Sequence, residues 1–216
     1  MTVVNDGLST NLTPVEHHHE RHDDAHHGAG AKLVIVGYGF WIFLLSDIVM
    51  FSAFFAAHAV LQDATDGGPK GSELLSIRNV AYETACLLLS SFTCGLILVG
   101  AEARRMAWTQ AALVATGLLG LTFLVLEVRE FSELISQGAG PQRSAFLSSF
   151  FALVGCHGAH VSVGLLWLGT MMAQLFVKGF RDDILRRLLC FNLFWHMLDI
   201  VWVAVFTLVY LVGDAR

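Results

Sequence analysis

The stretch FWHMLDIVWVAVFTLVYLVG, residues 194–213, has the length and apolar character of a helix that crosses a lipid bilayer. Such a helix rises 1.5 Å per residue and needs about 20 mostly apolar residues to cross the bilayer core. Two ionisable residues, His196 and Asp199, nevertheless lie inside the stretch, three positions apart and therefore on one helix face. An ionisable side chain costs at least about 2.5–3.5 kcal/mol near the centre of a membrane helix. The pair is therefore predicted to have partners inside the protein.

The composition of the whole chain agrees with a membrane protein. Of the 216 residues, 55% are hydrophobic and only 14% are charged, whereas an ordinary soluble domain carries about 25% charged residues. The formal net charge of −5 argues against a nucleic-acid-binding protein.

Apolar segments long enough to cross a bilayer occur five times, which predicts an all-α membrane protein. The expected spans are residues 37–61, 80–101, 108–131, 145–177 and 187–212. Residues 1–32 are polar and hold most of the histidines, so they are expected to form a disordered, cytoplasmic tail. A histidine-rich tract can also bind divalent metal ions, but the scarcity of apolar residues favours a solvated, disordered tail.

Basic residues in the loops predict the orientation. The loops after the second and fourth spans carry six of them, against three in the loops on the opposite side: Arg104, Arg105, Lys178, Arg181, Arg186 and Arg187 against Lys70, Arg78 and Arg143. Because cytoplasmic loops are enriched in Lys and Arg, the N-terminus is expected inside and the C-terminus outside. Arg186 and Arg187 are also candidates for binding anionic lipid headgroups.

Further polar residues lie within the other spans. Asp47 in the first span has a similar predicted depth to His196, which makes the two an expected contact. His157 and His160 are three apart in the fourth span and, with His196 and Asp199, form an expected buried polar brace. An outer polar cluster is expected from residues near the opposite face: His58, Glu83, Glu127 and Glu130.

These residues alone leave three functional interpretations open. The first is a small b-type cytochrome, because histidine is a common axial ligand of haem. The second is a proton or solute carrier, because buried acids and histidines can form relays, although no span is interrupted by proline. The third is a non-catalytic helical subunit of a larger complex, in which polar pairs hold helices together.

Three segments carry a family resemblance. They are YGFWIFLLSDIVMFSAFFAAHAVL at 38–61, FFALVGCHGAHVSVGLLWL at 150–168 and NLFWHMLDIVWVAVFTLVYLVG at 192–213. Together they resemble subunit III of the haem-copper terminal oxidases, and the H-G-x-H-V and W-H-x-x-D-x-V-W elements are specific as a pair. The five-span length resembles the cytochrome o ubiquinol oxidase form more than the cytochrome c oxidase form, which remains the alternative.

The resemblance implies two helical bundles around a V-shaped cleft filled with phospholipid. It implies an inner-membrane subunit without haem, copper or a catalytic centre of its own. Such a subunit packs against subunit I, which holds the haems and copper, and assembles with subunits II and IV. It stabilises subunit I and supports proton uptake while quinol is oxidised and oxygen is reduced to water. Asp47 matches the family's carbodiimide-reactive carboxylate, which implies either proton-uptake support or a structural acid.

Overall fold

The computed structural model of the protein describes residues 17–62, 64–65 and 77–211, and the side chains of residues 34–62, 64–65 and 78–210. The chain divides into two units, Met1–Val36 and Gly37–Arg216. Of the first unit, residues 17–36 are helical, so the helix begins within the segment expected to be disordered. Residues 1–16 of that expected tail lie outside the described residues. All that follows concerns the second unit.

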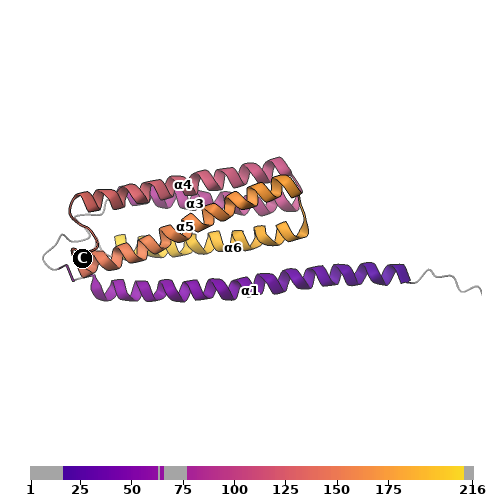
Figure 1. Ribbon diagram of the computed structural model, residues 1–216, viewed down its shortest axis with the longest axis horizontal. Coiled ribbons are helices and arrows are strands. Elements are labelled where there is room, and N and C mark those ends of the chain that lie inside the picture. Colours follow the sequence, from indigo (N-terminus) through magenta and orange to yellow (C-terminus); the bar gives the residue numbers. More distant parts are fainter. Residues whose placement is uncertain (1–16, 63, 66–76, 212–216) are drawn as a thin grey trace, which may run out of the picture. The chain divides into compact units, whose positions relative to one another are not determined.

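The described chain is built of helices, without a strand among its described residues (Figure 1). They are α1 (His17–Leu61), α3 (Ile77–Glu102), α4 (Met106–Ser136), α5 (Ala145–Lys178), α6 (Asp182–Val205) and the short π-helix η1 (Phe206–Leu211) that continues α6. Five segments are long and apolar enough to cross a membrane: Val34–Leu61, Arg78–Glu102, Met106–Ser136, Ala145–Lys178 and Asp182–Tyr210. The prediction of an all-α chain with five helices of this length and apolar character is thus confirmed, and the third helix extends further at its end than the sequence indicated.

Local sequence explains where the helices begin and end. Ser144 caps the start of α5, where its Oγ accepts a hydrogen bond of 3.2 Å from the backbone N–H of Leu147. Gly179 follows the end of α5 with a φ of 68°, a conformation that glycine adopts without steric cost. The turn from α3 to α4 passes through Arg104, which has a φ of 49°. These tight turns bring consecutive helices together in antiparallel fashion.

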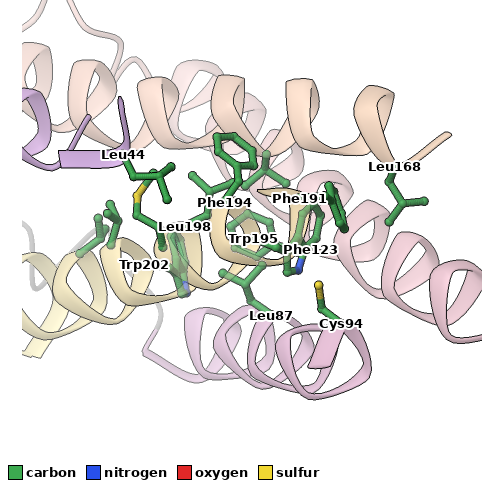
Figure 2. Packing of buried hydrophobic residues seen from close by; sticks show 14 of the residues in the cluster. Leu44, Leu87, Cys94, Phe123, Leu168, Phe191, Phe194, Trp195, Leu198 and Trp202 are labelled. Atoms are coloured by element: carbon green, nitrogen blue, oxygen red, sulfur yellow. The ribbon is translucent and has the colours of Figure 1, made fainter. Parts of the chain in front are cut away.

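Helices α3 to α6 pack into one bundle. α3 lies along α4 and α6, and α5 lies along the same two helices. The interior is filled by large apolar side chains, among them Leu87, Phe123, Leu198 and Trp202 (Figure 2). Burial of this apolar surface is the main source of compactness within the subunit.

Residues 37–61 of α1 lie against α5 and α6 through a few large side chains. Leu44 and Phe51 are buried in this contact, and Phe40 packs edge-on against Trp167 of α5 with ring centroids 5.9 Å apart. Beside these contacts, an apolar groove of about 390 Å³ runs between α1 and α6. Its walls include Trp41, Ile48 and Ile200, and His196 is its ionisable lining residue.

Candidate functional site

The polar side chains of α6 form a seam of hydrogen bonds with α3. Trp195 Nε1 donates to Ser90 Oγ over 3.0 Å, and Trp202 Nε1 donates to Thr84 Oγ1 over 3.1 Å. Asn192 Nδ2 donates to the backbone carbonyl of Cys94 over 2.9 Å. The seam therefore joins two helices that are far apart in the sequence.

His196 and Asp199 belong to this seam. His196 Nδ1 lies 2.7 Å from Ser91 Oγ of α3, and the same hydroxyl lies beside the carboxylate of Asp199. A hydroxyl has one proton to donate and can also accept, so Ser91 can bridge the imidazole and the carboxylate. Ser91 of α3 is thus a partner of both residues. Asp199 Oδ1 remains buried without a partner in the described structure.

Asp47 faces α5 instead of forming the expected bond to His196. Its carboxylate lies in Coulombic range of Cys156, and its Oδ2 is buried without a hydrogen-bond partner among the described residues. One turn along α5, His160 Nδ1 donates to the Cys156 carbonyl over 2.8 Å. His196 is engaged by Ser91, so no hydrogen bond in the described part of the chain joins Asp47 to His196.

His157 is the most enclosed of the four histidines that the spans contain. Its side chain has no exposed surface, and neither ring nitrogen has a partner among the described residues. Three aromatic rings surround it: Trp202 at 5.1 Å, Phe123 at 5.8 Å and Phe51 at 6.4 Å between centroids. His157 therefore sits in an aromatic cage where α1, α4, α5 and α6 meet.

The expected outer polar cluster separates into two groups. His58 of α1 pairs with Ser149 of α5, with 3.0 Å between Nδ1 and Oγ. Ser149 donates its own proton to the Phe146 carbonyl, so His58 Nδ1 is the donor of this bond. The bond ties the end of α1 to the start of α5.

The second group, which we call the acidic cluster, consists of Glu83, Glu127, Glu130 and Tyr210. Glu83 comes from α3, the other two acids come from α4, and Tyr210 comes from η1. The Coulombic interactions of Glu127 include both other acids, and those of Tyr210 include all three. Sequence reasoning identified the acids but missed Tyr210, because nothing in an apolar C-terminal stretch indicates which helix it will face.

The two arginines proposed for lipid headgroups lie near the start of α6. Arg187 is exposed and donates from Nη1 to Gln174 Oε1 of α5 over 2.8 Å. Arg186 is partly buried. Both lie at the end of the bundle where α5 ends and α6 begins, opposite the acidic cluster.

No group of three His, Cys, Asp or Glu side chains is placed to hold a metal ion within the residues that the structure describes. The six histidines of the N-terminal segment, and with them the possible metal-binding tract, lie outside the residues whose side chains are described.

Comparison with known proteins gives consistent matches over most of the chain. Residues 17–214 match the family described as cytochrome c oxidase subunit III. The chain is 48% identical to cytochrome bo(3) ubiquinol oxidase subunit 3 of Pseudomonas aeruginosa, covering 89% of this chain and 90% of the relative. It is 45% identical to the protein of the same name in Pseudomonas putida, with 87% and 89% covered. Quinol oxidase subunit 3 of Bacillus subtilis is 41% identical, with 81% and 86% covered.

Proposed function

Because the chain belongs to the cytochrome c oxidase subunit III family, we propose that it serves a quinol oxidase of the bo(3) type as its third subunit. It is a multi-pass membrane protein and a non-catalytic part of an oxidoreductase complex. The observation that carries this function is identity of 41–48% to quinol oxidase subunits over more than four fifths of the chain. The same relatives favour a quinol oxidase over a cytochrome c oxidase, and over a small cytochrome or a carrier.

The role we assign is to stabilise subunit I, which would hold the haems and copper, and to assemble with subunits II and IV. Apolar side chains on α1 support this contact, because they are exposed within the single chain: Tyr38, Ile42, Val49 and Val60. A surface of this kind meets either lipid or other membrane helices. The complex would lie in the inner membrane, with the N-terminus of this subunit in the cytoplasm.

Bound phospholipid is part of the proposal, and the groove between α1 and α6 supports it. The groove is lined almost entirely by apolar side chains, which suits an acyl chain. Arg186 and Arg187 are the proposed contacts for an anionic headgroup at the end of the bundle where α6 begins. This groove is the feature of the described chain that would correspond to the expected lipid cleft.

Asp47 is proposed to support proton uptake by the complex. One oxygen of its carboxylate is buried and has no hydrogen-bond partner among the described residues, which supports a role beyond holding helices together. The alternative is a structural acid that orders α1 against α5. His157, His160, His196 and Asp199 are proposed as internal polar contacts that position the helices and take no part in the oxidase chemistry.

Co-purification tests the function. The chain is tagged at its C-terminus in cells that express its oxidase, purified in a mild detergent, and its partners are identified together with a reduced-minus-oxidised spectrum. We expect a haem-copper subunit I in the same complex and quinol-driven oxygen consumption. Purification of the chain without any oxidase subunit under conditions that preserve the remaining complex would refute the proposal.

A further inference from the structure

The acidic cluster is a concentration of buried acid at the end of the bundle where α4 ends. Only 1% of Glu83 and 2% of Glu127 and of Tyr210 is exposed, while Glu130 is partly buried. Each of the three acids lies in Coulombic range of the other two. Tyr210 of η1 is the fourth member of the cluster and lies in Coulombic range of all three acids. Its ring packs against Phe150 of α5, with 6.1 Å between the ring centroids.

The cluster has unused hydrogen-bonding groups. Both carboxylate oxygens of Glu127, one oxygen each of Glu83 and Glu130, and the hydroxyl of Tyr210 have no partner among the described residues. Elsewhere in the same bundle, Ser90, Thr84, Asn192 and both buried indoles are hydrogen-bonded. A buried polar group without a partner is uncommon in a native protein and points to a partner that a single chain does not supply.

No counter-charge faces the cluster from the described helices packed around it. From α5, Phe150 packs against Tyr210, while His157 is enclosed by aromatic rings that include Trp202. The ionisable groups of α6, His196 and Asp199, lie at Ser91. On α4, Arg129 is exposed and Glu133 adds another acid one turn beyond Glu130. Among the described residues, the one ion pair is Arg181–Asp183, at the opposite end of the bundle.

Three adjacent carboxylates without a cation cannot all be ionised in an apolar interior, because neighbouring like charges and loss of hydration both oppose it. We propose that Glu83, Glu127, Glu130 and Tyr210 form a buried proton-binding site, in which the three carboxyl groups share protons drawn from the aqueous phase at the end of the bundle where α4 ends. Each proton taken up removes one negative charge from the cluster and turns one acceptor-only carboxylate into a group that can also donate a hydrogen bond.

The position of Glu130 gives the site a route to water. Glu130 is only partly buried, and Glu133, one turn further along the same helix face, is exposed and in Coulombic range of it. A proton can therefore pass from the surface through Glu133 and Glu130 to the fully buried Glu127. The site is independent of Asp47, which faces α5, and of the proposed oxidase function, because it depends only on residues of this chain.

Infrared spectroscopy of the purified full-length subunit within its complex tests the site. We expect a carboxylic-acid C=O stretching band at neutral pH that shifts to lower frequency in D₂O and loses one component in Glu127→Gln. The control is Glu102→Gln, which removes an exposed acid at the other end of the bundle, where α3 ends, and leaves the band unchanged. If Glu127→Gln retains the subunit in the complex and the band is the same as in the parent, the proposal is wrong.

A second measurement needs no substitution, since a change at a fully buried acid can prevent assembly. The parent protein is treated with dicyclohexylcarbodiimide, which reacts with protonated carboxyl groups in apolar surroundings, and the labelled peptides are identified by mass spectrometry. We expect label on at least one of the three buried acids, none on Glu133, and slower labelling as the pH rises. If none of the three acids is labelled, the assignment of a proton-binding site is wrong. It is also wrong if Na⁺ suppresses the labelling at constant pH, because the cluster would then bind a metal cation. The label is read on this chain whether or not an oxidase co-purifies.

Discussion

The indole of Trp195 on α6 donates a hydrogen bond to Ser90 of α3, and its ring fills space that glycine leaves open on α4 and α5. A Cβ at Gly120 would lie 2.8 Å from Trp195 Cζ2, and a Cβ at Gly164 would lie 2.9 Å from Trp195 Cζ3. One side chain thus touches three neighbouring helices. The glycines are required here because their missing side chains allow this close approach.

Gly164→Ala should destabilise the subunit by about 1–3 kcal/mol, because the added methyl group forces a rigid, buried ring to move. The matched control is Gly169→Ala on the same helix, where a Cβ meets nothing within 4 Å. That control should be neutral or slightly stabilising, since alanine favours helix over glycine by up to about 1 kcal/mol. Thermal unfolding of the detergent-solubilised protein measures both, and equal transition temperatures for the two variants would contradict the prediction.

Ser91→Ala should weaken the contact between α3 and α6, because it leaves His196 Nδ1 without its partner and removes the hydroxyl beside Asp199. We expect a loss of about 1–3 kcal/mol, the usual cost of orphaning a buried polar group. Ser162→Ala is the control, because Ser162 bonds only to the Gly158 carbonyl of its own helix. Subunit retention in the purified complex at rising temperature compares the two. Earlier loss of the Ser162 variant would count against a structural role for Ser91.

Asp47→Asn tests the proposed support of proton uptake. The substitution keeps the shape of the side chain and removes its ability to take up a proton, so we expect normal assembly and a shorter active lifetime during turnover at high pH. The measurement is oxygen consumption by the purified complex over many turnovers. An unchanged lifetime together with full subunit content would leave Asp47 with a structural role only.

The proposed orientation is tested by reporter fusions. A periplasm-specific phosphatase fused after Tyr210 should be active, and the same reporter inserted in the turn between α3 and α4, at Arg104, should be inactive. The reverse pattern would invert the assigned orientation. It would also move the acidic cluster to the cytoplasmic side without changing its chemistry.

Apolar length was enough to place all five spans, because a helix in lipid must be apolar over a fixed distance. The sequence also identified the ionisable side chains within the spans, since each is costly there. What it could not supply is the rotation of each helix about its own axis. Asp47 and His196 were matched by depth, yet His196 turns toward Ser91 and Asp47 toward α5.

The same limit explains what was missed. Ser90, Ser91 and Thr84 are ordinary residues in membrane helices, and only the packed structure shows that they meet Trp195, His196 and Trp202. Tyr210 was missed because it reaches Glu127 from a π-helix that continues α6, and a π-turn changes which face a residue presents.

The hydrogen-bond directions along α3 bear on the biogenesis of the protein. Thr84 and Ser90 donate their hydroxyl protons to the Val80 and Leu87 carbonyls of their own helix. The hydroxyl protons of both side chains are therefore hydrogen-bonded within α3 before α6 has been synthesised. For this reason α3 can enter the bilayer without a partner helix. The oxygen lone pairs left over can then accept the indole protons of Trp202 and Trp195 once α6 has been synthesised. The seam between α3 and α6 therefore forms only after both helices have been made.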